Sequence, residues 1–372
     1  MKRIGSSLLI ALILLAGCTH RPPAPSQPTY RPASWRQLPA WRGNDLRPSL
    51  AALLQSCKAL NTRPAWHAIC AVAGKLDAND NARIRAFFER HFRPWQLRDR
   101  RGRQQGLITG YYEPILHGSR TPDARFRYPV YGVPDDLLRI ELDDVYPQLK
   151  GLRLRGRLVG KRVVPYYTRK EIEAGKSPVG KALLWVDDPI ELFFLHVQGS
   201  GRIRLQDGSL LRVGYADQNG HPYRSIGKRL VEQGELSYEQ VSLQSIRAWA
   251  RAHPERVPAL LASNPSYVFF RILPDDLTAP LGALGVPLTG GYSLAVDRRV
   301  IPLGAPVYLD TQWPNARKPL RRLMMAQDTG GAIKGAIRAD FFWGSGTKAG
   351  ELAGRMKQAG RIWVLLPRGQ TP

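Results

Sequence analysis

From Leu107 onward the sequence breaks into short runs of β-branched, aromatic and leucine residues that are separated by Gly and Pro. Runs of four to eight such residues between turn residues are typical of β-strands. This texture predicts a mainly β fold with some helices for most of the chain. The expected strands are 107–112, 128–133, 152–159, 183–186, 192–198, 201–205, 294–296, 306–309, 323–326, 336–342 and 362–366.

Helical periodicity is concentrated before this region. Asp45 is placed to cap a helix whose apolar positions run through 46–60. A second helix is expected over 79–92, because Pro94 then stops the pattern. One further helix is expected after Ser237, whose Ser-Tyr-Glu-Gln sequence fits a capping box.

The first residues read as a targeting signal. Lys2 and Arg3 precede an apolar stretch over 4–15 that is too short to span a bilayer, and Cys18 follows small residues at the cleavage point. The Leu-Ala-Gly-Cys ending resembles a bacterial lipobox, in which cleavage leaves the cysteine at the new N-terminus to carry acyl chains. Because Thr19 is not Asp, this resemblance favours sorting to the outer membrane. We therefore expect the chain on the periplasmic face of that membrane, anchored through Cys18.

A proline-rich segment follows the anchor and predicts an extended tether that rises about 3.1 Å per residue. Its prolines are Pro22, Pro23, Pro25, Pro28, Pro32 and Pro39.

Apart from Cys18, the chain has only Cys57 and Cys70. Both fall in helical apolar patterns, and the compartment implied by the signal is oxidising. We therefore expect a disulfide between them, worth about 3 kcal/mol, rather than a catalytic thiol.

The charge of the chain predicts an anionic partner. Lys and Arg number 55 against 30 Asp and Glu, which gives a formal charge of +25. Nucleic acid, lipid headgroups and an acidic polymer would all satisfy this excess, but export from the cytoplasm argues against nucleic acid. Nine Trp, fourteen Tyr and ten Phe exclude disorder over most of the chain.

Common catalytic and cofactor motifs are missing from the sequence. The seven His are scattered, without a His-Glu-x-x-His or paired Cys-x-x-Cys pattern, so we expect no metal site. No Gly-x-Ser-x-Gly occurs, and the Gly-rich stretches 199–201 and 344–348 lack the spacing of a phosphate loop. Asp328-Thr329-Gly330 matches an aspartic-protease loop, but that chemistry needs a second copy, which the sequence lacks. No cofactor is expected.

Three carboxylates in the C-terminal β region remain as candidates for chemistry. Asp297 follows an expected strand, and Asp328 opens an Asp-Thr-Gly-Gly stretch. Asp340 is unusual because it lies within an expected strand and just before Phe341, Phe342 and Trp343. An apolar setting would raise its pKa and keep it protonated, as a general acid requires; Asp328 would act in the same direction and Arg338 would oppose it.

Asp297 and Asp328 lie in two of a series of stretches that resembles the MltA family of membrane-bound lytic murein transglycosylases, and Asp340 follows the last of them in Arg-Ala-Asp-Phe-Phe. The last stretches alone are similar to the three-Asp "3D" domain, which other proteins also carry. In order along the chain, the matching stretches are 110–114 (GYYEP), 197–201 (VQGSG), 214–227 (from Gly-Tyr to Asn-Gly-His-Pro-Tyr-Arg-Ser-Ile-Gly), 264–270 (NPSYVFF), 294–297 (LAVD), 301–304 (IPLG) and 326–335 (AQDTGGAIKG).

The resemblance implies a double-psi β-barrel with a second, inserted β domain and a glycan groove between the two. It divides the chain into a signal peptide (1–17), a lipidated cysteine with tether (18–44), a barrel domain with N-terminal helices (45–108 and 272–372) and an insert (109–271). The partners implied are peptidoglycan strands and the membrane, with no nucleic acid. The resemblance leaves open whether the chain has protein partners in a murein-synthesis complex. A monomer is expected.

The resemblance also implies that Asp340 is the single catalytic acid/base, supported by Asp328 and Asp297. It would cleave the β-1,4 bond between N-acetylmuramic acid and N-acetylglucosamine. Intramolecular attack by the muramoyl C6 hydroxyl would replace the water and the second carboxylate of a hydrolase, leaving 1,6-anhydro ends. The residues expected to line the groove are Thr109, Tyr111, Tyr112, Gln198, Gly199 and Ser200.

Two other functions fit the same residues. A non-catalytic peptidoglycan-binding lipoprotein would use the groove without turnover, but it has no need of Asp340 in an apolar strand. A glycoside hydrolase with Asp328 and Asp340 as an acid–base pair would instead leave reducing ends.

Overall fold

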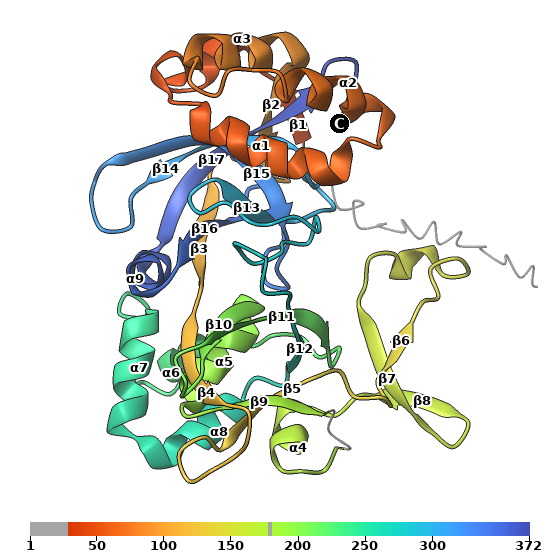
Figure 1. The fold of residues 1–372 in the computed structure, drawn as a ribbon, viewed down its shortest axis with the longest axis vertical. Helices are drawn as coiled ribbons and strands as arrows, with labels where there is room; N and C mark the ends of the chain where they lie inside the picture. Colours follow the sequence, from red (N-terminus) through yellow and green to blue (C-terminus); the bar gives the residue numbers. More distant parts are fainter. Residues whose placement is uncertain (1–28, 178–180) are drawn as a thin grey trace, which may run out of the picture.

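The computed structural model describes residues 29–177 and 181–372. The signal peptide, Cys18 and the first prolines of the tether therefore lie outside the described residues. The chain forms a barrel domain and an insert domain that is built around a second sheet (Figure 1).

The barrel is a ring of strands closed by the last strand of the chain. The strands follow the order β17-β14-β15-β13-β16-β3, and a pairing between β17 and β3 closes the ring. This is the mainly β barrel fold expected from the sequence. Its strands are β3 (Gly106–Glu113), β13 (Ser293–Val296), β14 (Pro306–Gln312), β15 (Pro319–Asp328), β16 (Ala339–Ser345) and β17 (Lys357–Pro367), and β2 (Phe92–Arg98) and β1 (Thr29–Pro32) extend the sheet beyond β17.

The strand β17 is unusual in pairing with three other strands. Residues 357–360 pair with β3, 363–367 pair with β2, and 361–364 pair with β14 on the opposite edge. The barrel interior is filled by apolar side chains from these strands, among them Leu294, Val307, Met324, Phe341 and Val364, all fully buried.

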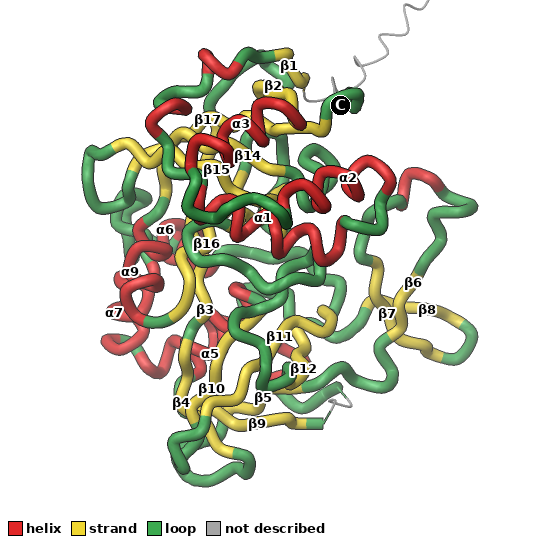
Figure 2. The backbone as a smooth tube through the Cα atoms, turned by 45° about the horizontal axis from the view of Figure 1, so that its top comes forward, coloured by secondary structure: helices red, strands yellow, loops and turns green. Residues whose placement is uncertain are grey.

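Three helices cover one face of the barrel (Figure 2): α1 (Arg47–Leu60), α2 (Pro64–Ala73) and α3 (Asn81–His91). Apolar residues of α1 pack on Tyr308, Leu323 and Met325 of the barrel. A disulfide joins Cys57 of α1 to Cys70 of α2. Helix α1 begins at Arg47 with Leu46 at its N-cap, one residue later than expected; the Asp45 side chain still accepts the backbone N–H of Arg47 (3.1 Å) and also pairs with the Arg47 guanidinium.

The C-terminal part of the expected tether is folded, which corrects the boundary at residue 44. β1 pairs with β2 from Thr29 onward, and short 3-10 helices follow at Trp35–Gln37 and Trp41–Gly43. Leu38 and Trp41 are each only 2% exposed. Their apolar side chains draw this segment into the core beneath the helices, which an extended tether would not allow.

The insert domain has a six-stranded sheet in the order β12-β11-β10-β4-β9-β5 and a small three-stranded sheet, β6-β7-β8. Other short 3-10 helices lie at Pro147–Leu149 and Pro254–Arg256. The strands are β4 (Ile115–Ser119), β5 (Tyr128–Tyr131), β6 (Leu138–Ile140), β7 (Leu154–Val159), β8 (Arg162–Pro165), β9 (Ala182–Val186), β10 (Ser200–Arg204), β11 (Leu210–Gln218) and β12 (Val268–Ile272).

The insert contains more helix than the sequence suggested. Its helices are α4 (Arg169–Glu173), α5 (Pro189–Gln198), α6 (Ile226–Glu232), α7 (Leu243–Ala252) and α8 (Val257–Ala262). The strand expected over 192–198 is wrong, since these residues belong to α5, which Asp188 caps. The expected capping box at Ser237 is also wrong: α7 is capped by Ser242 and Ser245 five residues later, where the apolar pattern of the helix begins.

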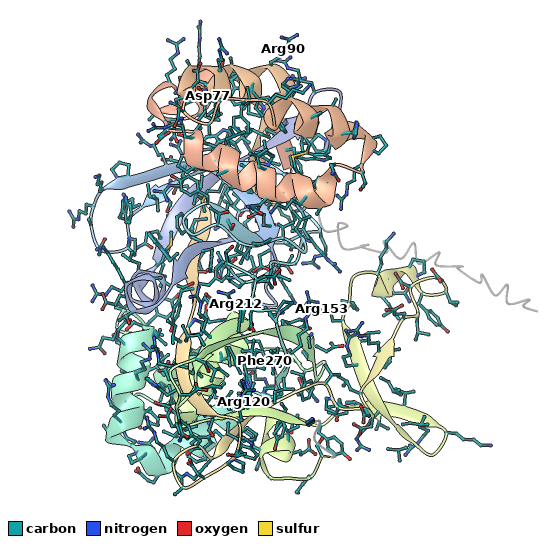
Figure 3. All side chains as sticks on the ribbon, viewed as in Figure 1. Asp77, Arg90, Arg120, Arg153, Arg212 and Phe270 are labelled. Carbon is teal, nitrogen blue, oxygen red and sulfur yellow. A yellow bond between two sulfur atoms is a disulfide. The ribbon has the colours of Figure 1, made fainter. Side chains whose placement is uncertain are left out.

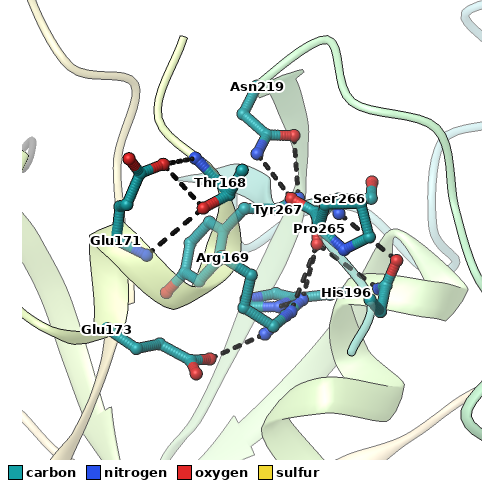
Figure 4. A network of polar contacts seen from close by, with 10 residues as sticks. Thr168, Arg169, Glu171, Glu173, His196, Asn219, Pro265, Ser266 and Tyr267 are labelled. Atoms are coloured by element: carbon teal, nitrogen blue, oxygen red, sulfur yellow. Dashed lines mark hydrogen bonds and ion pairs between the residues drawn. The ribbon is translucent and has the colours of Figure 1, made fainter. Parts of the chain in front are cut away.

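The buried side chain of Arg169 connects several elements of the insert domain (Figure 4). Arg169 is 1% exposed; it donates to Ser266 O and to His196 Nδ1 (2.7 Å) and pairs with Glu173 (2.9 Å). Burial and the adjacent guanidinium hold the pKa of His196 well below its usual range, so the ring accepts this bond in its neutral form. Asn219 bonds Pro265 O and the Tyr267 N–H. The Asn-Pro-Ser-Tyr stretch therefore has a packing role.

Candidate active site

The Asp340 carboxylate lies at the centre of three neighbouring barrel strands. On β16, Asp340 is paired with Ala295 of β13 on one side and with Thr109 of β3 on the other. Because β16 and β3 are parallel and in register, the Thr109 side chain lies beside it, and its hydroxyl donates to Asp340 Oδ1 at 2.6 Å. The strand begins at Ala339, three residues later than expected from the sequence.

Burial raises the pKa of Asp340. The bond from Thr109 and the charge of Arg338 oppose this effect, because both favour the ionised carboxylate. Arg338 is the residue expected to act in this direction, and Phe342, 2% exposed, supplies apolar surroundings on the same face of β16, whereas Phe341 packs in the barrel interior. Asp340 as a whole residue is half-buried. The raised pKa favours the protonated form of Asp340, which a general acid requires.

Asp328 lies at the end of β15 and shares this site. Its Oδ1 accepts the N–H groups of Thr329 (2.8 Å) and Ala283 (3.0 Å), and its Oδ2 accepts the Tyr111 hydroxyl (3.0 Å). Burial raises the pKa of Asp328 to about 6; these three bonds oppose the shift, and the charge of Asp340 adds to it. The charge of Asp340 is the smallest of these effects, so burial accounts for most of the raised pKa of Asp328.

Tyr111 and Tyr112 point to opposite sides of β3. Tyr111 shares the face of Thr109, where its ring packs on Phe342 with centroids 5.0 Å apart and its hydroxyl is committed to Asp328. Tyr112 faces away from the carboxylates: its hydroxyl accepts a bond from Arg247 and its ring packs among apolar side chains between the insert helices and α9 (Thr347–Arg355). The structure thus brings Tyr111, but not Tyr112, together with Asp340.

The segment Gln198-Gly199-Ser200 joins α5 to β10. Gln198 Oε1 accepts the backbone N–H of Tyr112, which fixes the end of α5 against β3. Gly199 takes a left-handed conformation (φ 78°) that ends the helix. Ser200 is partly exposed at the start of β10. These residues border the barrel strand that carries Thr109, and none of them contacts Asp340.

Asp297 is held away from the two other carboxylates. It is 6% exposed, pairs with Arg299 (2.7 Å) and accepts the N–H of Gly335 (2.9 Å). These bonds more than offset burial and lower its pKa. Its contact with Gly335 secures the loop that leads into β16, so any support it gives Asp340 acts through the backbone.

Glu113 is a residue whose importance the sequence analysis missed. It is fully buried where β3 leaves the barrel, and it pairs with Arg202 (2.7 Å) and Arg212 (2.8 Å) of the insert sheet. It also accepts the Ser345 hydroxyl at the end of β16 (2.5 Å). A signal was present, because a carboxylate within the apolar stretch Gly-Tyr-Tyr-Glu-Pro needs buried partners.

In the part of the chain that the structure describes, the carboxylates coincide neither with a metal cluster nor with the cavity on the insert domain. Among residues 29–177 and 181–372, no three His, Cys, Asp or Glu side chains are arranged to hold a metal ion. A cavity of about 580 Å³ lies on the insert domain, and residues on its walls include Asp135, Asp136, Lys181 and Arg271. It is separate from the pair formed by Asp328 and Asp340.

Comparisons with known proteins give a consistent result. The family model described as "MltA specific insert domain" matches residues 107–271, and that for the "3D domain" matches 292–366. The chain is 38% identical over 278 residues to the membrane-bound lytic murein transglycosylase A of Escherichia coli K12, covering 73% of this chain and 68% of the relative.

Solved structures agree over nearly the whole chain. The crystal structure of MltA from Neisseria gonorrhoeae is 40% identical with a TM-score of 0.77, covering 94% of this chain and 93% of the other. That of E. coli MltA with bound chitohexaose is 30% identical with a TM-score of 0.67, covering 92% and 95%.

Proposed function

This chain belongs to the MltA family of membrane-bound lytic murein transglycosylases, and from this premise we propose that it cleaves peptidoglycan strands. The bond cleaved is the β-1,4 linkage between N-acetylmuramic acid and N-acetylglucosamine, and the product carries a 1,6-anhydromuramoyl end. The bound chitohexaose of the E. coli relative supports a β-1,4-linked N-acetylated glycan as the ligand.

Asp340 is the catalytic residue in this proposal. Its protonated form donates to the glycosidic oxygen as the bond to the muramoyl C1 breaks. The resulting carboxylate then takes the proton of the muramoyl C6 hydroxyl while that oxygen bonds to C1. The proton lost in the first step is recovered in the second, so one carboxyl group suffices and no water is consumed.

The observation that carries the proposal is the environment of Asp340. Burial raises its pKa, which favours the acid form, and Thr109 holds Oδ1 through a 2.6 Å bond, which leaves Oδ2 to meet the substrate. Asp328 supports it as a second, interacting carboxylate that Tyr111 keeps in position. Asp297 acts at a distance by fixing the loop before β16.

The test compares murein digests by the wild-type chain and the Asp340→Asn variant, with muropeptides identified by mass spectrometry. Products one water lighter than hydrolytic muropeptides are expected from the wild type and not from the variant. Asp207→Asn, in an exposed turn between β10 and β11, is the matched control and is expected to retain full activity. Ordinary reducing muropeptides would instead make the chain a hydrolase with Asp328 as its second carboxylate. Binding without turnover by the wild type would make it a binding protein.

We also propose that Cys18 anchors the chain at the periplasmic face of the outer membrane. The lipobox and the membrane-bound relatives support this arrangement. None of the helices in the described ranges has the length and apolar character needed to cross a bilayer. The Cys18→Ala variant is expected in the soluble fraction with unchanged activity on soluble glycan; a variant that still pellets with membranes would contradict the anchor.

The division into a barrel domain (45–108 and 272–372, to which the folded residues 29–44 are now added) and an insert (109–271), with the glycan bound between them, stays part of this proposal. Glu113 and the insert model starting at residue 107 support a boundary near the end of β3. A monomer without cofactor is expected to suffice for the reaction, and partners in a murein-synthesis complex stay a prediction.

A further inference from the structure

Three arginines alternate along one strand of the small sheet in the insert. Arg155 and Arg157 lie on β7 and Arg153 directly precedes it, so the three share one side of the strand. Arg155 donates to Asp217 of the main insert sheet at 2.8 Å, and the Arg157 guanidinium lies 4.2 Å from the centre of the Tyr167 ring. Both are thus committed to contacts within the insert domain.

Arg153 extends beyond the insert to the barrel. Its guanidinium carbon lies 5.6 Å from the centre of the Tyr215 ring, and its Nη2 lies 3.5 Å from the Thr329 hydroxyl oxygen. Thr329 directly follows Asp328 and donates its backbone N–H to that carboxylate. Figure 3 shows Arg153 between the barrel and the insert sheet. The positively charged side chain of Arg153, from the insert domain, therefore contacts the residue that directly follows Asp328.

The charge of Arg153 is available to a ligand. The side chain is exposed, and no ion pair within residues 29–177 and 181–372 includes it. Asp217, the buried carboxylate that the same strand faces, is already held by both Arg139 and Arg155 at 2.8 Å. The aromatic ring of Tyr215 supports the guanidinium without neutralising it.

We propose that Arg153 binds a carboxylate of the peptide stem on a muramoyl residue and so makes the enzyme prefer peptide-bearing glycan to bare glycan. This inference rests on the proposed function. While the lactyl carboxyl groups of murein are amide-linked to peptide stems, the N-acetylated sugar backbone is uncharged, and the free carboxylates of the strand are on those stems. A guanidinium presents a planar fork of donors that matches a carboxylate, whereas the sugar hydroxyls and acetamido groups offer it no negative charge.

The test measures kcat and KM of the Arg153→Gln variant on two substrates: murein strands with their peptides, and the same strands stripped by an amidase and then amidated, so that the lactyl carboxyl groups freed by the amidase carry no charge. With peptide-bearing strands we expect KM to rise about tenfold at unchanged kcat, equal to about 1.4 kcal/mol. With bare strands both parameters should match the wild type. Arg153→Lys keeps the positive charge but lacks the planar fork of donors. Its KM for peptide-bearing strands should therefore lie between those of the wild type and Arg153→Gln.

A matched control is Arg162→Gln, at the opposite end of β7 and β8 in the same small sheet, which should behave as wild type on both substrates. Equal losses by Arg153→Gln on both substrates would overturn the inference, because the residue would then contact the sugar or shift the loop at Thr329. No change on either substrate would overturn it as well. In both cases turnover by the wild type leaves the proposed function standing, whereas a wild type that cleaves neither substrate removes both.

Discussion

The raised pKa of Asp328 predicts that this residue makes the folded protein less stable at neutral pH. Burial moves its pKa from about 3.8 to about 6, so the folded state holds this proton more tightly than the unfolded state. Such a group contributes stability that is complete below pH 4 and is lost as the pH rises through 6. A shift of about two units corresponds to at most about 3 kcal/mol, since one unit is worth about 1.4 kcal/mol and residual solvent access reduces the effect.

The variant Asp328→Asn should therefore be more stable than the wild type at pH 7.5, by up to about 3 kcal/mol, and nearly equal to it at pH 4. An asparagine fits the same contacts: its oxygen can accept the N–H groups of Thr329 and Ala283. The Tyr111 hydroxyl can turn to accept from the amide. Ionisable groups elsewhere are shared by both proteins, so they cancel in the difference.

Urea denaturation of both proteins at pH 4, 5, 6 and 7.5 measures this difference directly. The control is Asp207→Asn, because hydrogen bonds from Ser209 lower the pKa of Asp207, so its removal should act in the opposite direction. A stability difference for Asp328→Asn that stays constant from pH 4 to 7.5 would refute the reasoning, since the pKa of Asp328 would then be unshifted.

The other predictions concern the contacts around the site and between the domains. Thr109→Val removes the donor to Asp340, so kcat/KM should fall at least tenfold, and the loss of activity at rising pH should move to higher pH because the pKa of the acid rises further; an unmoved profile would contradict this. Glu113→Gln should lower the free energy of unfolding by about 3 kcal/mol in urea titrations, since two arginines lose their buried counter-charge. Replacing Cys57 and Cys70 by Ser should cost about 3 kcal/mol for a bridge of sequence separation 13, and midpoints unchanged from wild type would show the bridge to be dispensable.

The sequence predicted the barrel strands well because their apolar runs are flanked by Gly and Pro, as in 306–309 and 362–366. It failed for 192–198 because α5 is buried on nearly all sides. A helix without a polar face has no 3.6-residue periodicity, and a short apolar run then reads as a strand. The correct signals lay just outside the run, in Asp188 as N-cap, Pro189 at the first turn and Gly199 after the end.

The candidate site was predictable in its residues but not in its geometry. Asp340 attracted attention as a carboxylate in an aromatic strand, a property that can be read locally. Its bond from Thr109 joins residues 231 positions apart and depends on the register of β16 with β3, which no local pattern encodes. The opposite roles of Tyr111 and Tyr112 follow from the same strand geometry, since adjacent side chains point to opposite faces.

The position of β17 has a consequence for how the chain acquires its structure. This last strand pairs with β2, β3 and β14, so the barrel closes only when residues 357–367 are present. The insert sheet is complete in the chain by Ile272 and needs none of them. During export the insert can fold before the C-terminal segment has crossed the membrane. The other barrel strands cannot close the ring until β17 is available. A chain that stops before residue 357 should keep the insert and leave the carboxylate pair without a barrel around it.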